Sequence, residues 1–291
     1  MWLVLSLVLL SLLSCVSVGE RNQVLSHRAD NSQPHVKTSS IFSGELASCQ
    51  QLMPVQTVTD NTRSINPENI SFLNWNIYKG NGHNWQQDLS AFAKTHHVMT
   101  IQEAMLSDEL TVLLEKHEFN WVMNTAFYLD GAAAGVMNVS SSDAVHSCGF
   151  KTKEPIIRIP KSTLLSYYNI DGYEKKLLVA NIHGINFTLG TASYREQLQA
   201  LYQAAIHHDG PMIVAGDFNS WSDERMAEVE TFVELLSLSE LEYSVNNKTH
   251  IFGNAIDHVF YKQLELVDHQ VHQVLSSDHN PISVNFRYRQ I

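Results

Sequence analysis

The sequence predicts an α/β fold in one domain that begins near residue 68 and runs to residue 291. From that point on, short apolar runs alternate with amphipathic segments of helical period, a pattern typical of layered α/β proteins. The chain has 291 residues, of which 44% are hydrophobic and 17% charged, so it can bury a large core and does not have the composition of a disordered or collagen-like chain. No further linker signal divides residues 68–291.

The expected strands are the short apolar runs of this domain. In chain order they are residues 70–77, 98–101, 121–124, 135–140, 164–169, 177–182, 212–215, 259–261 and 282–286. Because successive strands are separated by helical segments or polar turns, each run is expected to be buried in a sheet.

Four helices are expected between these strands. The first covers residues 85–93, and the second follows Ser107, a predicted N-cap with acidic residues in the next turn. Ser193 and Glu196 form a predicted capping box for the third helix. Ser222 is expected to cap the fourth. The apolar faces of the last two are Leu198, Leu201, Tyr202 and Ala205, and Met226, Val229 and Val233.

The N-terminus is expected to be a targeting segment. Residues 1–18 are apolar apart from serines and carry no charged side chain, as in the apolar region of a secretory signal. Cleavage near residues 17–19 would release a secreted or periplasmic protein. Residues 12–15 loosely resemble a bacterial lipoprotein box, which would place a lipid on Cys15. An uncleaved anchor is the third alternative, although the run is short for a membrane span of about 17–25 residues. Membrane attachment is expected only through this segment.

Residues 20–67 are expected to form a polar tether or an extended wrap, because they are rich in Ser, Asn, Gln and Thr and have no sustained period. A short apolar stretch at residues 52–55 is expected to dock on the domain. The three cysteines are too few for a disulfide scaffold, but Cys49 and Cys148 would allow one disulfide in an oxidising compartment.

The charge balance argues against tight, non-specific binding of duplex nucleic acid. There are 19 Lys and Arg residues against 30 Asp and Glu, a formal net charge of −11. A duplex binder normally carries a basic surface. A site that reaches nucleic acid through a bound cation is still compatible with this charge.

Polar residues gather at the ends of the predicted strands, where ligands bind to α/β sheets. Each one alone has a structural explanation as a turn former, a solvated strand end or a core histidine. Their shared location favours one convergent site. These residues are Asn76, Glu103, His183, Asp217, Asn219, Asp257, Asp278 and His279.

This set contains carboxylates, amides and imidazoles without thiolates, which suits Mg²⁺, or alternatively Mn²⁺, better than a structural zinc ion. A histidine with a carboxylate partner can orient and deprotonate water, and a cation with amide donors can stabilise charge on a phosphoryl group. The residues therefore indicate metal-assisted phosphoester hydrolysis. A serine hydrolase is disfavoured because the Gly-x-Ser-x-Gly elbow is missing from the sequence.

These motifs resemble those of the endonuclease/exonuclease/phosphatase superfamily. They occur in the family's order at residues 73–77, 101–103, 181–183, 216–219, 256–260 and 277–281. The Gly-Asp-Phe-Asn and Ser-Asp-His sequences are the most specific. Residues 74–79, 154–158, 181–190 and 216–221 are also similar to YafD-like bacterial proteins, a branch that brings no settled substrate.

The resemblance implies a four-layer α/β/β/α sandwich and a role for each motif residue. Glu103 would be a magnesium ligand with Asn76 beside it and Asp278 assisting. His279 would activate water or hold the phosphate, and Asp257 would orient it. The remaining catalytic residues would be Asp217 and Asn219, which position the nucleophile and phosphate or protonate the leaving group, and His183, which contacts the phosphate.

Two further residues are expected to contact substrate. Asn181 lies in the motif before His183, and Arg158 belongs to the basic stretch at residues 151–161, which either contacts a phosphodiester or forms a solvated strand edge. One departure is His258, because many family members carry an aromatic residue after the aspartate. The sequence therefore does not determine how the side chains around residue 258 pack.

The sequence as a whole predicts a secreted or periplasmic, Mg²⁺-dependent phosphodiesterase of nuclease type, with nucleic acid as the favoured substrate. A phospholipid or phosphomonoester hydrolase is the alternative. A binding protein without catalysis is a third hypothesis, disfavoured by the intact set of acids and histidines. No obligate protein partner is inferred.

Overall fold

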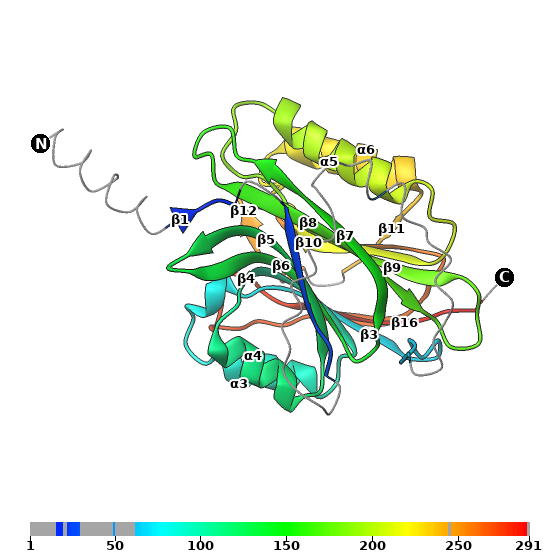
Figure 1. Cartoon of the computed structure of the whole chain (residues 1–291). Helices are drawn as coiled ribbons and strands as arrows, with labels where there is room; N and C mark the ends of the chain where they lie inside the picture. The colour runs from blue at the N-terminus through cyan, green and yellow to red at the C-terminus, as the bar shows by residue number, and fades with distance from the viewer. Residues whose placement is uncertain (1–15, 20–21, 30–48, 50–61, 244–245, 290–291) are drawn as a thin grey trace, which may run out of the picture.

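A computed structural model describes residues 16–19, 22–29, 49, 62–243 and 246–289. Two β-sheets pack face to face, and a pair of helices covers the outer face of each sheet (Figure 1). Helices α3 (Trp85–Ala93) and α4 (Asp108–Lys116) cover the first sheet, and α5 (Ala192–Ala205) and α6 (Asp223–Leu236) cover the second. This arrangement confirms the four-layer α/β/β/α sandwich.

The first sheet has the strand order β1-β5-β6-β4-β3-β16-β15, with β2 also paired to β5. Its strands are β1 (Val16–Ser17), β2 (Gln23–His27), β3 (Ile70–Asn76), β4 (Val98–Met105), β5 (Asn120–Leu129), β6 (Ala132–Ser140), β15 (Glu265–Val271) and β16 (Ile282–Arg287). Strands β3 and β4 are parallel, and Asn76 pairs with Gln102. The ends of the first two expected strands therefore lie side by side.

The second sheet has the order β11-β14-β10-β9-β8-β7. Its strands are β7 (Ala144–Lys153), β8 (Pro160–Asn169), β9 (Lys176–His183), β10 (Met212–Asp217), β11 (Ser239–Glu240) and β14 (Asp257–Lys262). A small hairpin is formed by β12 (His250–Ile251) and β13 (Asn254–Ala255). Asp217 pairs with His183 on one side and Asp257 on the other, so the register sets three polar residues in one row.

The central strands are buried on both faces, which explains their continuous apolar runs. All seven residues of β3 and all six of β10 are buried. Phe72, Val179, Ile213 and Val284 belong to one apolar cluster that joins strands of both sheets. The polar strand ends are thus held at the border of a rigid core.

Several elements differ from the sequence expectation. Strands β7 and β15 were not expected, because both are edge strands with mixed polarity and lack an apolar run. Helix α5 begins at Ala192 with Thr191 at the N-cap, so Ser193 lies inside the first turn and is not the cap. The predicted caps are confirmed: the side chain of Ser107 accepts the N–H of Leu110, and that of Ser222 accepts the N–H of Arg225.

Part of the region before residue 68 forms an extended strand on the domain. Strand β2 pairs with β5, and its residues Val24 and Leu25 are buried. Cys49 forms a disulfide with Cys148 of β7. The apolar stretch at residues 52–55 and residues 1–15 lie outside the described residues. Within the part of the chain that the structure describes, the helices are too short or too polar to cross a membrane.

Candidate active site

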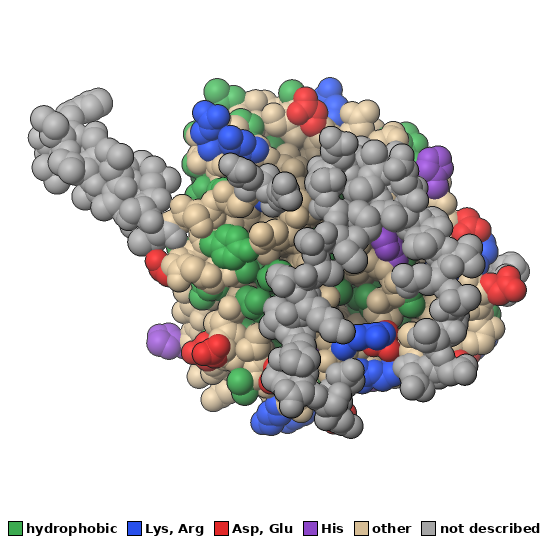
Figure 2. All heavy atoms as spheres, in the orientation of Figure 1, with side chains coloured by type: hydrophobic (Ala, Val, Ile, Leu, Met, Phe, Trp, Pro, Cys, Tyr) green, Lys and Arg blue, Asp and Glu red, His purple; other side chains and the backbone are tan. Residues whose placement is uncertain are grey.

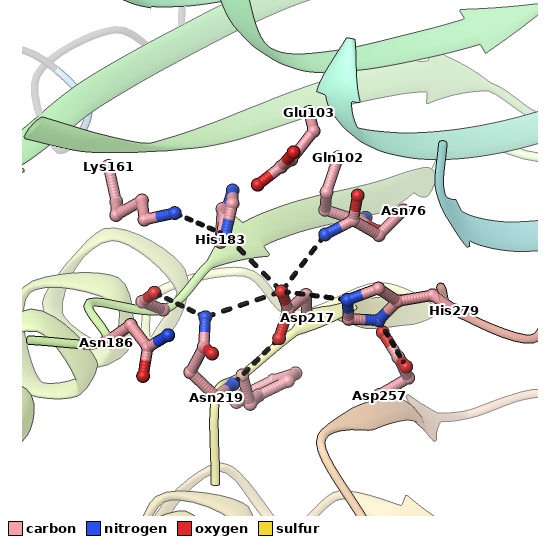
Figure 3. A network of polar contacts seen from close by, with 12 residues as sticks. Asn76, Gln102, Glu103, Lys161, His183, Asn186, Asp217, Asn219, Asp257 and His279 are labelled. Carbon is pink, nitrogen blue, oxygen red and sulfur yellow. Dashed lines mark hydrogen bonds and ion pairs between the residues drawn. The ribbon is translucent and has the colours of Figure 1, made fainter. Parts of the chain in front are cut away.

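The carboxylate of Asp217 is the point at which the polar strand ends meet (Figure 3). Its Oδ2 accepts a hydrogen bond from Nδ2 of Asn76 at 3.1 Å. The same oxygen lies 3.3 Å from Nε2 of His183 and 3.9 Å from Nε2 of His279. Nδ2 of Asn219 is 3.4 Å away. Four of the residues chosen from the sequence therefore surround one buried oxygen of a fifth, Asp217.

The backbone around Asp217 is built to present this carboxylate. Gly216 has a φ of +154°, and a Cβ there would lie 1.9 Å from the carbonyl oxygen of Ile182, so only glycine fits beside β9. Asn219 adopts a left-handed φ of 50°, and its N–H donates to Oδ1 of Asp217 at 2.9 Å. This turn closes the strand and fixes the orientation of the carboxylate.

His279 and Asp257 form a hydrogen-bonded pair. Nδ1 of His279 lies 2.8 Å from Oδ2 of Asp257, and both side chains are buried. Ser277 locks the loop to β3, because its hydroxyl donates to the carbonyl of Asn76 at 2.6 Å and accepts the N–H of His279 at 3.1 Å. Trp75 donates to the carbonyl of His279 at 3.1 Å. Ser277 and Trp75 thus hold the backbone of His279, and Asp257 holds its ring.

The charges of these groups differ because their surroundings differ. Burial raises the pKa of Asp217 to about 6, although the charge of His279 opposes the shift. Burial alone would lower the pKa of His279, but the carboxylates of Asp257 and Asp217 together raise it to about 10. Burial keeps the pKa of His183 well below its ordinary value. At neutral pH the site therefore holds a neutral His183, an ionised Asp217 and an imidazolium at His279.

Glu103 is directed toward the site by a bulge in β4. The register with β6 shifts between Ile101 and Ala104, and Glu103 in this bulge has a left-handed φ of 50°. Its carboxylate forms an ion pair with Lys79, whose φ is 55°. A strained residue in the bulge of β4 and another in the turn after β3 thus face each other, as is common at functional sites.

Lys161 also reaches the candidate site, although the sequence did not single it out. Its ammonium group donates to Nε2 of His183 at 2.8 Å, and burial lowers its pKa (Figure 3). The basic stretch at residues 151–161 was the available signal, but nothing in the sequence distinguishes this inward-pointing lysine from Lys153, which is exposed.

A divalent cation has suitable ligands here. Ligand atoms of Asp217, Asp257 and His279 lie within 4.8 Å of one another; the two carboxylates could hold a metal ion, and His279 could join them only in its neutral form. Of the expected ligands, Asn76 ends β3 and pairs with Gln102 of β4, and Glu103 follows Gln102 in the bulge of β4. Asp278 is exposed beside His279. Carboxylate and carboxamide oxygens match a hard cation.

The two expected substrate contacts lie elsewhere. Asn181 is fully buried between the sheets, where its amide donates to the carbonyls of Ile101 and Met137 and accepts from Gln102. Because its hydrogen bonds are used internally, the expectation that it contacts substrate is wrong. Arg158 lies in the turn between β7 and β8 with an exposed side chain.

His258, the position at which the sequence departs from the expected family pattern, packs as an aromatic ring. Its ring stacks on Phe260 with centroids 5.3 Å apart and packs edge-on against Phe218 at 5.5 Å. Its Nε2 lies 2.9 Å from the hydroxyl of Ser220 and 3.1 Å from the carbonyl of Ala255. The imidazole therefore packs as a ring and also fastens the loop after Asn219.

Arg225 supports the same loops and was missing from the sequence-based set. Of the expected core face of α6, Val229 is buried and Met226 and Val233 are partly buried, but Arg225 is also buried, with 2% of its surface exposed. Its guanidinium donates to the carbonyls of Ile185, Asn186 and Asn219 at 2.7–2.9 Å. It also stacks between the rings of Tyr194 and Trp221.

Comparison with known proteins agrees with the motifs. Residues 73–279 match the model of the Endonuclease/Exonuclease/phosphatase family. A UPF0294 protein of Vibrio campbellii is 42% identical over 221 residues, covering 75% of this chain and 77% of that protein. A UPF0294 protein of Vibrio parahaemolyticus is 35% identical over 286 residues and 97% of each chain.

Solved structures share the fold at low sequence identity. The catalytic domain of human Nocturnin, solved with a bound sulfate anion, superposes with a TM-score of 0.59 and 15% identity, covering 78% of this chain and 96% of that domain. A mannosyl-6-phosphatase of Bacteroides thetaiotaomicron has a TM-score of 0.58 and 15% identity, covering 75% of this chain and 100% of that protein. Both likenesses concern the architecture.

Proposed function

The chain belongs to the endonuclease/exonuclease/phosphatase family, and on this premise we propose that it hydrolyses a phosphodiester bond with the help of Mg²⁺. The observation that supports the proposal is the environment of Asp217. An ionisable carboxylate with a pKa of about 6 lies 3.9 Å from an imidazolium whose pKa is about 10. In such a pair the carboxylate of Asp217 can accept a proton from water, while the imidazolium of His279 stabilises the negative charge of a phosphoryl oxygen.

In this proposal Asp217 is the base. Its Oδ2 orients a water molecule and accepts its proton as the water oxygen bonds to phosphorus, and the amide of Asn76 keeps Oδ2 in place. The P–O bond to the leaving alcohol breaks in the same displacement, and the departing oxygen takes a proton from solvent water. Nδ1–H of His279 donates to Asp257, which leaves Nε2–H of the same ring to bind a phosphoryl oxygen. Because the ring is already charged, it stabilises the additional negative charge of the transition state.

The metal fits the remaining ligands. Glu103 and Asn76 would hold the cation, with Asp278 beside them, and the bound ion would stabilise charge that builds up on the phosphoryl oxygens. Mn²⁺ could replace Mg²⁺, because the two ions share a preference for oxygen ligands.

Nucleic acid is the first substrate class to test, and a phospholipid or a phosphomonoester is the second. On the face of the described residues that Figure 2 shows, acidic and basic side chains are interspersed. Arg158 and Lys153 are exposed at the β7–β8 turn, where they could contact a phosphate group. The exposed apolar side chains described below favour the phospholipid.

The test is a substrate panel with the purified full-length chain. Plasmid DNA, phospholipid vesicles and a sugar phosphate are incubated with Mg²⁺ or with excess EDTA, and released product is measured. We expect hydrolysis of one substrate that EDTA abolishes. Asp217→Ala and His279→Ala should each abolish it, whereas exposed Asp171→Ala should not. Unchanged activity in either site variant would refute the assignment.

We further propose that the protein works outside the cytoplasm, in a secreted or periplasmic form. The apolar residues 1–18 support this, and so does the Cys49–Cys148 disulfide, because such bonds persist in oxidising compartments. Fractionation of cells that express the full chain with a C-terminal epitope tests it. Recovery of the protein in the cytoplasm with free thiols at both cysteines would refute it.

A further inference from the structure

Exposed apolar side chains gather on three loops beside the candidate active site. Ile156 and Ile157 are 57% and 40% exposed in the β7–β8 turn. Phe187 and Leu189 are 49% and 89% exposed in the loop after β9, and Phe252 is 86% exposed at the tip of the β12–β13 hairpin. Single exposed apolar residues are ordinary, but a contiguous group of them marks an interaction surface. We call these five residues the apolar rim.

Hydrogen bonds and ring contacts join the three loops into one surface. The N–H of Ile156 donates to the carbonyl of Phe187 at 3.4 Å. Trp221 donates to the side chain of Asn186 at 2.8 Å, and its ring lies 6.0 Å from that of Phe252. These contacts connect the β7–β8 turn, the loop after β9 and the hairpin, so the five rim residues are carried by loops that touch one another.

Buried charged groups hold this surface in place. Glu154 is fully buried, and its two carboxylate oxygens accept the N–H groups of Asn186 and Phe187, each at 2.7 Å. From the other side, Arg225 donates to the carbonyls of Ile185 and Asn186. Burying charged groups is costly unless they are fully hydrogen-bonded. The apolar side chains are thus displayed by a rigid support.

The rim adjoins the candidate active site directly. The loop that carries Phe187 and Leu189 begins immediately after His183. Asn219, which contacts Asp217, also donates to the carbonyl of Gly184 in that loop at 3.0 Å. Figure 3 shows Asn186 next to Asn219. A phosphoester that reaches Asp217 must therefore arrive beside an apolar surface.

A phospholipid bilayer places phosphoesters next to an extended apolar phase. Three of the five rim residues, Ile156, Ile157 and Leu189, are aliphatic and cannot stack on bases as aromatic residues do. The net charge of −11 also disfavours nucleic acid at this surface. Exposed Lys153 and Arg158 flank the β7–β8 turn and match anionic headgroups.

We propose that the apolar rim docks on a phospholipid bilayer and presents headgroup phosphoesters to Asp217 and His279. The docking is a second membrane contact, separate from any attachment through residues 1–18, and it orients the site toward the bilayer. The choice of a phospholipid as substrate rests on the proposed hydrolysis, whereas the docking itself does not.

The docking is tested with a site-specific probe in the full-length chain. A polarity-sensitive fluorophore is attached to Leu189→Cys or Phe252→Cys in a Cys15→Ser background, and vesicles of phosphatidylethanolamine and phosphatidylglycerol are added. We expect a blue-shifted, brighter emission that lipids with brominated chains quench. The matched control is Val112→Cys on α4. Val112 is 61% exposed, but it lies on the helices that cover the first sheet, away from the rim. No shift at either rim position, or an equal shift at Val112, would overturn the proposal.

Hydrolysis separates docking from catalysis. The double variant Leu189→Ser, Phe252→Ser should lose at least tenfold in activity on vesicle phospholipid and stay within twofold of wild type on bis(4-nitrophenyl) phosphate, a soluble diester. Equal losses of activity on both substrates would refute the claim that these two residues act through membrane docking. Cleavage of plasmid DNA without a fluorescence shift would assign the face to nucleic acid and refute docking. A shift without hydrolysis of any substrate would uphold docking and refute the proposed function.

Discussion

Asp217 and His183 lie side by side at the ends of two parallel strands, with Oδ2 of the aspartate 3.3 Å from Nε2 of the histidine. The register of β9 and β10 produces this pair, because both strands end at the same edge of the sheet. The same rule brings Asp257 opposite Asp217 from the antiparallel strand β14. The site is therefore a direct product of strand pairing, and its charges follow from how deeply that edge is buried.

Asp257→Asn should lower activity by about two to four orders of magnitude, the range that a positioned proton-transfer group contributes. The amide cannot stabilise the imidazolium, so the pKa of His279 should fall from its present value of about 10. Activity on a soluble diester and an NMR titration of His279 measure the two effects. Asp171→Asn, in an exposed turn, is the control. An unchanged pKa of His279 would show that Asp257 does not set its charge.

The pH profile should show two limbs. Asp217 must be ionised to accept a proton, so activity should fall tenfold per pH unit below about 6, and His279 must be protonated, so activity should fall again above about 10. Lys161 lowers the pKa of Asp217, so Lys161→Gln should move the acid limb to higher pH. Lys153→Gln, exposed on the neighbouring strand, should leave the limb in place. A shift of the acid limb to lower pH in Lys161→Gln would contradict the electrostatic argument.

The sequence could predict most of the site because the motif residues follow buried strands, and strand ends converge in a sheet. It could not find Lys161, Glu154 or Arg225, because each is a charged residue whose burial depends on carbonyls and rings far away in the chain. The direction of the Asn181 side chain was equally hidden from the sequence. Its motif position is near the site, but its amide bonds carbonyls between the sheets. The edge strand β15 was missed because its residues are largely exposed and carry no apolar run. The roles of the site residues stay predictions.

Lys79→Ala should strengthen divalent-cation binding. Lys79 forms an ion pair with Glu103, and both side chains are partly exposed, so a cation that binds Glu103 must displace an interaction of up to about 1 kcal/mol. The expected gain is therefore up to about fivefold in affinity. Calorimetric titration of Mn²⁺ into the substrate-free protein measures it, and Lys94→Ala, exposed at the end of α3, is the control. Weaker binding by Lys79→Ala would mean that Lys79 organises Glu103 for the metal.

Reduction of the Cys49–Cys148 disulfide should destabilise the protein. The bond closes a loop with a sequence separation of 99 residues, for which the chain-entropy model gives about 4–5 kcal/mol and measured native bonds typically give about 2–5. Urea unfolding of wild type with and without dithiothreitol, and of the Cys49→Ser, Cys148→Ser variant, measures the change. The double variant should no longer respond to dithiothreitol. Cys15→Ser should match wild type under both conditions.

Arg225→Met should impair both stability and catalysis, since the guanidinium bonds three carbonyls that hold the loops after β9 and β10. Methionine keeps much of the side-chain volume but leaves these buried acceptors unpaired, at a cost of about 1–3 kcal/mol for each group that water cannot reach. Denaturant unfolding measures the loss, and kcat and KM on a soluble diester show whether Asn219 has moved. Arg225→Lys should recover part of the stability through one retained donor. The exposed pair Arg195–Glu228 offers the comparison, because Arg195→Met on the outer face of α5 should change stability by less than about 1 kcal/mol. If Arg225→Met lowered stability and left kcat unchanged, Arg225 would support the fold and have no part in positioning Asn219.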